Sequence, residues 1–366
     1  MKKKKKKKVH KFSIILFVLD ILAFACLFLA YGPITYFKNL LVTTAMTTMN
    51  HHYLARTIYT DKMIADVLNH NYIKEFDDNT NTSDINFNNE DNGNYESIYE
   101  EQILRRNPGN DLYKVIELNE SGYHGYLVVV YDASKVQLMM AANAEGGGQQ
   151  LPNIVKDNNA QVAINASGLY YPYTNKYGVK ATGTVIKDGK IYSIGGGTGW
   201  GGGLIGFNYD NVLVLTNENA NEAIANGMRD AVEFGPFLIV NGVPATIEGN
   251  GGYGLAPRTA IAQRKDGIVL FLVIDGRTVN SLGIDMSSMI DIFMRYKAHN
   301  AANLDGGGSS TLVVDGEVIN NPKGYGYEGG RYLVNAWAVI DKEGTILEEN
   351  NLINESGDEN PNEKNI

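Results

Sequence analysis

Twenty consecutive residues near the N-terminus, Phe12 to Tyr31, are almost wholly apolar and carry a single charge, at Asp20. As an α-helix this run is roughly 30 Å long, which matches the hydrocarbon core of a bilayer. Asp20 adds about 3 kcal/mol to the cost of insertion, which the surrounding Leu, Ile and Phe residues can offset. The run is longer than the apolar region of a usual signal peptide, and no clean small-x-small cleavage site follows it. It therefore predicts an uncleaved transmembrane signal anchor at residues 12–31, with a cleaved signal peptide as the alternative.

Charge is distributed unevenly along the 366 residues. The formal net charge is −9, and because eight lysines lie within residues 2–11, the rest of the chain carries −17. Residues 1–11 are expected to form a basic cytoplasmic tail, which directs the remainder outward as a single-pass protein of the cell membrane with its main domain extracellular. The acidic remainder argues against a nucleic-acid partner.

Composition divides that remainder into four segments. Residues 32–76 have apolar residues at helical spacing and predict a juxtamembrane helical segment. Residues 77–109 are rich in Asn and Asp and predict a flexible linker that cannot pack a core. Residues 110–345 combine short apolar runs with many glycines and predict one domain. Residues 346–366 predict an acidic flexible tail.

The segment 110–345 is expected to have the α+β fold, with a mixed β-sheet and few helices. The apolar runs that predict strands are Tyr126–Tyr131, Val136–Met140, Gln161–Ile164, Phe237–Val240 and Ile268–Ile274. Helices are predicted over Leu151–Asn158 and Asp285–Ala298. In the second helix Asp285 can act as the N-cap. Its apolar face comprises Met286, Met289, Ile290, Phe293 and Met294.

A carboxylate at a predicted strand end is followed by three glycines and two serines, in the segment Asn303-Leu304-Asp305-Gly306-Gly307-Gly308-Ser309-Ser310. Glycines allow the backbone to approach a ligand, and successive N–H groups can form an anion-binding nest. Asp305 is therefore a candidate acid or base, and Ser309 and Ser310 are candidate hydroxyl donors. A tight turn between two strands explains the glycines equally well.

Two further segments carry polar groups suited to a sugar phosphate. Arg258 begins one predicted strand, and the next strand ends in Asp275-Gly276-Arg277. The planar guanidinium of arginine can bind a phosphate through two hydrogen bonds. Asn165 can hydrogen-bond a sugar hydroxyl, and Tyr170 can stack on a sugar face. A surface arginine, a common Asp-Gly turn and packing tyrosines are the structural alternatives.

Taken together, these residues resemble the phosphodiester glycosidase family over about residues 110–342. The resemblance is carried by five segments: Asn165-Ala166-Ser167-Gly168, Gly235-Pro236-Phe237-Leu238, Pro257-Arg258-Thr259-Ala260-Ile261, Asp275-Gly276-Arg277 and Asn303-Leu304-Asp305-Gly306-Gly307-Gly308-Ser309-Ser310-Thr311. The family includes the enzyme that uncovers mannose 6-phosphate by removing N-acetylglucosamine, and its bacterial members are often described as exopolysaccharide-related. One difference is Asn165-Ala166-Ser167-Gly168-Leu169-Tyr170, where many members carry Asn-Gly-Gly-Phe-Phe.

The resemblance implies hydrolysis of a sugar-1-phosphate diester on a cell-surface glycan of the bacterial envelope, with release of the sugar. A phosphate leaves more readily than a sugar alkoxide, so the main tasks are binding the diester anion and activating water. Arg258 and Arg277 suit the first task. Asp305 suits the second as general base, with Asp275 as its partner. Asn165, Tyr170, Gly306, Gly307, Gly308, Ser309 and Ser310 would bind the substrate.

Two other functions are compatible with the same residues. The domain could be a non-catalytic module for glycan binding or envelope assembly, although such a module would be freer to lose Asp305 and both arginines. It could also be a metal-dependent phosphodiesterase that breaks the P–O bond, with Asp275, Asp305 and Asp315 holding Ca²⁺ or Mg²⁺. No cofactor is otherwise indicated. His124 and His299 are the only histidines beyond residue 100, so a zinc site with several histidines is not expected.

Overall fold

The computed structural model describes residues 3–48, 51–142, 144, 146–170, 179–195, 202–323 and 329–341. The predicted tail at 346–366 lies outside these residues. The chain forms two compact units. The first comprises Met1–Lys74, Thr246–Leu255 and Asp285–Ser287, and the second comprises the rest of the chain.

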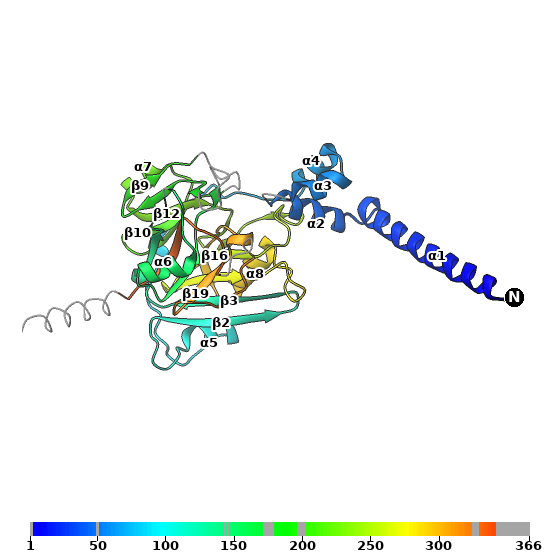
Figure 1. The fold of residues 1–366 in the computed structure, drawn as a ribbon. Coiled ribbons are helices and arrows are strands. Elements are labelled where there is room, and N and C mark those ends of the chain that lie inside the picture. Colours follow the sequence, from blue (N-terminus) through cyan, green and yellow to red (C-terminus); the bar gives the residue numbers. More distant parts are fainter. Residues whose placement is uncertain are drawn as a thin grey trace, which may run out of the picture. The chain divides into compact units, whose positions relative to one another are not determined.

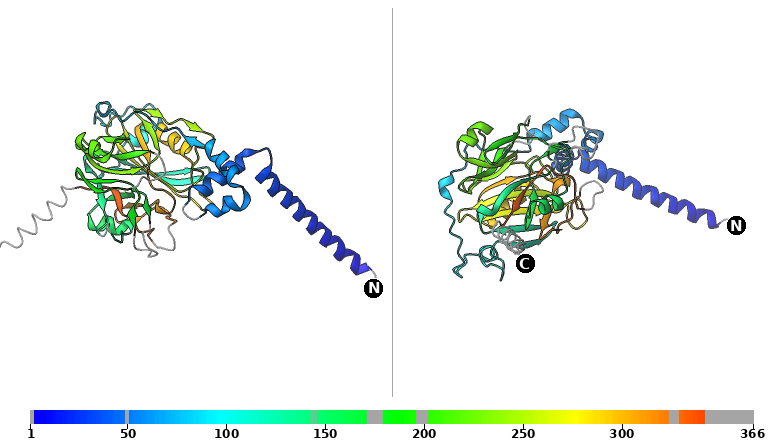
Figure 2. Two further views of the ribbon diagram at one scale, coloured as in Figure 1. Left: turned by 90° about the horizontal axis from the view of Figure 1, so that it is seen from above. Right: turned by 60° about the vertical axis from the view of Figure 1, so that its left-hand side comes forward.

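The first unit begins with the long helix α1, Lys3–Tyr31, followed by three short helices (Figures 1 and 2). These are α2 (Thr35–Met46), α3 (His52–Ile58) and α4 (Asp61–Asn69). They enclose a small core that includes Val42, Ala55 and Val67. Within the described residues, α1 is the one helix long and apolar enough to cross a membrane, and its apolar run is not buried by protein.

A segment from the middle of the sequence completes this unit. Strand β1 (Tyr72–Ile73) pairs with β15 (Ile247–Glu248). The Asn71 side chain donates to Val67 O at 2.7 Å and accepts from Asn250 N at 2.9 Å. Asn250 Nδ2 in turn donates to Thr43 Oγ1 at 2.9 Å. These bonds attach residues 246–255 to the helices.

The second unit contains three main sheets, and every strand pair described is antiparallel. The seven-stranded sheet has the order β14 (Val243–Pro244), β13 (Phe237–Val240), β18 (Ala298–Asn303), β16 (Arg258–Arg264), β17 (Val269–Ile274), β3 (Tyr123–Val130) and β2 (Tyr113–Glu120). The second sheet has the order β20 (Glu317–Val318), β19 (Leu312–Val314), β5 (Val162–Asn165), β21 (Asn335–Val339) and β4 (Val136–Met140). The third has the order β11 (Leu213–Thr216), β10 (Gly203–Asn208), β12 (Met228–Phe234), β8 (Val185–Lys187) and β9 (Lys190–Ser193).

Small elements complete the second unit. Strand β6 (Leu169–Tyr170) pairs with β7 (Lys180–Ala181). The α-helices are α5 (Ile98–Leu104), α6 (Leu151–Asp157), α7 (Ala220–Ala225) and α8 (Met286–Arg295), whose first residues belong to the first unit. Three short 3₁₀ helices are described as well, η1 (Thr82–Asp84), η2 (Ala133–Lys135) and η3 (Gly307–Ser309).

Apolar side chains from all three sheets form one core. Phe271 comes from the seven-stranded sheet, Trp337 from the second and Phe207 from the third. The rings of Phe207 and Trp337 meet edge to face at 5.4 Å. On its other side the second sheet packs against α6, and the third packs against α7. Because strands of different sheets share this core, the ends of these strands are held in fixed positions relative to one another.

The predicted α+β class is confirmed, and the expected mixed sheet is antiparallel throughout the described strands. Each apolar run predicted as a strand overlaps one of β3, β4, β5, β13 and β17, with Tyr131, Gln161 and Ile268 just outside the strands. The helix predicted over 285–298 ends at Arg295, because Lys297 has a left-handed backbone (φ 59°) and Ala298 begins β18. Met294, predicted on its apolar face, is exposed.

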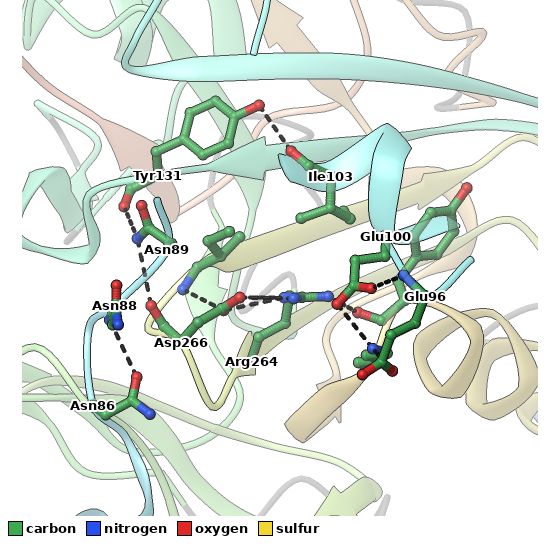
Figure 3. A network of polar contacts seen from close by, with 12 residues as sticks. Asn86, Asn88, Asn89, Glu96, Glu100, Ile103, Tyr131, Arg264 and Asp266 are labelled. Carbon is green, nitrogen blue, oxygen red and sulfur yellow. Dashed lines mark hydrogen bonds and ion pairs between the residues drawn. The ribbon is translucent and has the colours of Figure 1, made fainter. Parts of the chain in front are cut away.

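Residues 77–109 differ from the flexible linker that their composition predicts. Thr80 N donates to Leu215 O at 3.0 Å, and Leu215 N donates back to Thr80 Oγ1 at 2.9 Å. Asn89 Nδ2 donates to the carbonyl oxygens of Tyr131 and Asp266 (Figure 3). Ile103 in α5 is fully buried. Asparagine side chains here bond to backbone groups in place of apolar contacts, a pattern that composition alone does not reveal.

Candidate active site

Five strand ends meet where the chain passes from the seven-stranded sheet to the second sheet. Strand β18 ends at Asn303, which is paired with Ala260 on β16. Arg258, at the start of β16, is paired with Ile274 at the end of β17. Strand β5 ends at Asn165 and lies beside the start of β21. The connection from β18 to β19, residues 304–311, crosses this junction and carries the Asp-Gly-Gly-Gly-Ser-Ser sequence.

Backbone hydrogen bonds hold the connection in place. Leu304 N donates to Thr259 O at 2.9 Å, Asp305 N to Ala166 O at 3.3 Å and Gly307 N to Pro257 O at 2.8 Å. Gly306 allows this contact, because a Cβ there would lie 2.9 Å from the Pro257 carbonyl oxygen. The Asp305 backbone is therefore fixed by two sheets at once.

Asn165, predicted to bind the sugar, lies under this connection and is fully buried. Its Nδ2 donates to Asp305 O at 2.6 Å. Its Oδ1 accepts from Thr259 Oγ1 at 2.8 Å and from Thr311 N at 3.2 Å. The side chain thus braces the Asp305 loop from three directions.

Asp305 has the most perturbed carboxyl group of the site. Burial among protein atoms raises its pKa from 3.8 to about 6, although the residue keeps part of its surface in contact with solvent. The positive charge of Arg331, a hydrogen bond from Ser309 and one from the Gly306 backbone oppose that rise. Near neutral pH the carboxyl is therefore mostly ionised and accepts a proton far more readily than an ordinary aspartate.

Arginine side chains approach the glycine segment from neighbouring loops. A Cβ on Gly307 would lie 3.2 Å from Arg277 Nη2, so the guanidinium packs directly on this residue. Arg277 itself has a left-handed backbone (φ 58°), which non-glycine residues rarely adopt outside functional sites and turns. Arg258 is buried, and its Nε donates to Ile284 O at 3.2 Å.

Arg331 is a site residue that the sequence analysis missed. Its Nη1 lies 3.4 Å from Ser309 Oγ, and its charge acts on Asp305. It follows Gly329-Gly330 and precedes the buried strand β21. An arginine between a glycine pair and a central strand is a signal that could have identified it.

Asp275, predicted as the partner of Asp305, is buried and occupied by other groups. Its Oδ1 accepts from Asn321 N at 2.8 Å and from Asn320 Nδ2 at 3.1 Å. Its Oδ2 lies 3.1 Å from His124 Nδ1, and His124 Nε2 lies 2.9 Å from Glu117. Burial lowers the pKa of His124, but the bonds to Glu117 and Asp275 outweigh it and leave the pKa above its usual value. Through these contacts Asp275 helps to hold the turn that carries Arg277.

The remaining predicted residues are distributed around the loop. Gly308 and Ser309 lie in η3. Ser310 Oγ is buried without a hydrogen-bond partner among the described residues, and Ser310 O accepts from Asn320 Nδ2 at 3.1 Å. Tyr170, in β6, is exposed and available for stacking.

The residues considered for a cation do not form a ligand set. Asp315 accepts from Tyr113 Oη at 2.7 Å with both oxygens, and Asp275 is bonded as described above. In the part of the chain that the structure describes, no group of three or more His, Cys, Asp or Glu residues is placed to hold a metal ion.

Comparison with known proteins identifies the family that the chain resembles. The family model described as phosphodiester glycosidase matches residues 158–340, which include Asn165, Arg258, Asp305 and Arg331. The SPbeta prophage-derived uncharacterized protein YomE of Bacillus subtilis is 34% identical over 176 residues, which are 46% of this chain and 26% of that protein. Bovine N-acetylglucosamine-1-phosphodiester alpha-N-acetylglucosaminidase is 35% identical over 68 residues, 19% of this chain and 13% of the enzyme.

A solved structure shares the fold. The zebrafish N-acetylglucosamine-1-phosphodiester alpha-N-acetylglucosaminidase catalytic domain, auto-inhibited by its pro-peptide, superposes with a TM-score of 0.52 at 18% identity. The match covers 64% of this chain and 86% of that domain. The chain thus matches most of that catalytic domain but only 26% and 13% of the length of the two curated relatives.

Proposed function

Because this chain belongs to the phosphodiester glycosidase family, we propose that its second unit hydrolyses a sugar-1-phosphate diester and releases the sugar. The observation that carries the proposal is the buried Asp305 carboxyl, with a pKa of about 6, in a loop flanked by Arg277 and Arg331. One relative acts, by its name, on N-acetylglucosamine-1-phosphodiesters, so we take N-acetylglucosamine as the first sugar to test.

The proposed reaction uses Asp305 as general base. Its carboxylate takes a proton from water, and the water oxygen forms a bond to the anomeric carbon of the sugar. The bond between that carbon and the phosphate oxygen breaks, and its electron pair leaves on the phosphate as a phosphomonoester. Arg258, Arg277 and Arg331 provide guanidinium groups near this loop that suit binding of the diester and stabilisation of the departing phosphate. Asp275 and Asn165 would hold the loops that carry these groups.

Location forms the second part of the proposal. Residues 12–31 would span the cell membrane, with the lysines in the cytoplasm and residues 32–366 outside. A hydrolase held at that place would act on a glycan of the cell surface, such as a polymer with sugar-phosphate diester links. The bounds predicted from composition, 32–76 and 110–345, stay part of this proposal, except that residues 77–109 belong to the second unit and residues 246–255 to the first.

The decisive experiment uses full-length protein in detergent and the methyl ester of N-acetylglucosamine 1-phosphate. Wild-type protein should release free N-acetylglucosamine, and Asp305→Asn should lower the rate by roughly 10²–10⁴-fold. Asp111→Asn, at a highly exposed aspartate, is the matched control and should be as active as wild type. The proposal fails if wild-type protein releases no sugar from a broad panel of sugar-1-phosphodiesters.

Isotope labelling tests which bond breaks. In water labelled with ¹⁸O, attack at the anomeric carbon places the label in the released sugar. Label in the phosphate would mean cleavage of the P–O bond and would favour a phosphodiesterase. A loss of activity in the presence of a chelator would also support a metal-dependent phosphodiesterase. Binding of a sugar-phosphate polymer without any turnover would favour the non-catalytic module.

A further inference from the structure

The first unit exposes a cluster of large apolar side chains close to the end of α1. We call it the juxtamembrane apolar surface, and it comprises Ile34, Tyr36, Phe37, Tyr53, Leu54 and Ile58. Between 38% and 63% of each residue is exposed. The core of the same unit is formed by other residues, including Val42, Ala55 and Val67. None of the six residues of the surface belongs to this core.

Contacts within the first unit join this surface to α1. Tyr59 Oη donates to Ala30 O at 3.1 Å, and Tyr31 Oη donates to the Ile58 carbonyl oxygen. The rings of Tyr31 and Tyr59 meet edge to face at 5.8 Å. The end of α3 is therefore fixed to the end of the apolar run, which stops at Tyr31.

The positions of the other members follow from chain geometry. Leu54 lies four residues before Ile58 in α3, so the two side chains share one helix face. Tyr36 and Phe37 lie within six residues of Tyr31, which limits their distance from it to about 20 Å even for a fully extended chain. The exposed residues thus lie on the helices that directly follow the apolar helix, and the end of α3 is bonded to the end of α1.

We propose that the juxtamembrane apolar surface inserts into the headgroup layer of the membrane that α1 spans. Moving the exposed part of a large apolar side chain out of water is favourable, and six such residues lie on the short segment that follows the apolar helix. Three of the six are Tyr or Phe, and Tyr in particular favours the boundary between hydrocarbon and water. The partner is the phospholipid bilayer itself, and α2 and α3 lie on it. This inference rests on the proposed membrane-spanning role of α1 and not on the proposed hydrolysis.

Fluorescence quenching by brominated lipid tests the proposal. Full-length protein is reconstituted in phosphatidylcholine vesicles with and without brominated acyl chains, with Tyr36→Trp or Tyr53→Trp as an added reporter. Tyr72→Trp is the matched control, because Tyr72 is similarly exposed on β1 of the same unit but outside the surface. The contribution of the native Trp200 and Trp337 is subtracted with the wild-type protein.

We expect blue-shifted emission from Trp at positions 36 and 53, reduced at least twofold by brominated lipid, and little quenching at position 72. Equal quenching at all three positions, or water-like emission at 36 and 53, overturns the proposal. Blue-shifted emission that brominated lipid does not quench also overturns it, because a protein partner or a second copy then covers the surface. Flotation with vesicles after an alkaline carbonate wash is scored separately. Protein that fails to float refutes the anchor and this inference together, whereas sugar release is independent of both.

Discussion

Replacing Asp305 by Asn should remove activity and at the same time stabilise the second unit at neutral pH. In the unfolded chain this carboxyl ionises near pH 3.8, whereas in the folded protein its pKa is about 6. Below pH 3.8 both states are protonated. Between pH 3.8 and about 6 the unfolded state ionises while the folded state keeps its proton, so stability falls over this range; above it both states are ionised and the loss is complete.

The size of this loss follows from the two pKa values. At about 1.4 kcal/mol per pKa unit, a rise from 3.8 to about 6 corresponds to about 3 kcal/mol, and nearer 2 kcal/mol because Asp305 keeps some solvent contact. Asn carries no charge and avoids this cost. A domain of 150–250 residues shifts by roughly 2–4 °C per kcal/mol, so a loss of about 2 kcal/mol means that the variant should melt roughly 4–8 °C above wild type at pH 7.5.

Thermal unfolding of both proteins at pH 4.5 and 7.5 measures the effect, with tryptophan fluorescence as the signal. Trp337 is buried in the core of the second unit and reports its unfolding. Any effect of the Asn side chain on packing is the same at both pH values. The change, from pH 4.5 to pH 7.5, in the melting-temperature difference between variant and wild type therefore isolates the effect of the Asp305 charge. A difference in melting temperature that does not grow from pH 4.5 to pH 7.5 would refute a burial-raised pKa at Asp305.

Other predictions concern the groups around this carboxyl. If Asp305 is the general base, kcat/KM should rise about tenfold per pH unit below pH 6 and level off above it, as a pH–rate profile will reveal; a rate already constant at pH 4.5 contradicts this role. Arg331→Gln should lower kcat/KM at least tenfold. It should also move the midpoint of the pH–rate profile to higher pH, because the Arg331 charge lowers the Asp305 pKa. An unchanged midpoint would place Arg331 outside the site. Gly307→Ala should cost about 1 kcal/mol in urea unfolding and raise KM, because φ is +61° and the new methyl group meets Arg277; an unchanged KM would show that Arg277 does not bind substrate. His124→Gln should destabilise the protein most below about pH 6.5, and the difference should shrink as pH rises through the raised His124 pKa; a difference independent of pH would mean that the His124 charge does not contribute.

Much of the fold follows from local patterns in the sequence. Runs such as Val269–Ile274 are apolar at every position, and such runs form strands that are buried on both faces. The placement of Asp305 at a strand end was also predictable, because three glycines follow an apolar run. Sheet order was not, because pairing between strands as distant as β5 and β21 depends on the packing of the whole core.

The roles of single site residues were harder to predict. From the sequence, the Asn165 side chain could equally bind a sugar or the backbone. In the fold it bonds to Asp305 O and Thr311 N, which are brought to it by the connection between β18 and β19. Arg331 reaches Ser309 across 22 positions of sequence, so no local pattern connects the two. Asp275 looked like a second carboxylate of the site, but Asn320, Asn321 and His124 occupy it.

If α1 spans the cell membrane as proposed, the attachment of residues 246–255 to the first unit affects how the second unit could be released from the membrane. This segment pairs with β1 and bonds to Asn71 and Thr43, yet both of its ends continue into the second unit. A protease that cut once, after Lys74, would sever the direct link but leave the segment bound to the helices. Release of the second unit would then also require loss of these contacts, so a single cleavage is expected to leave it at the membrane.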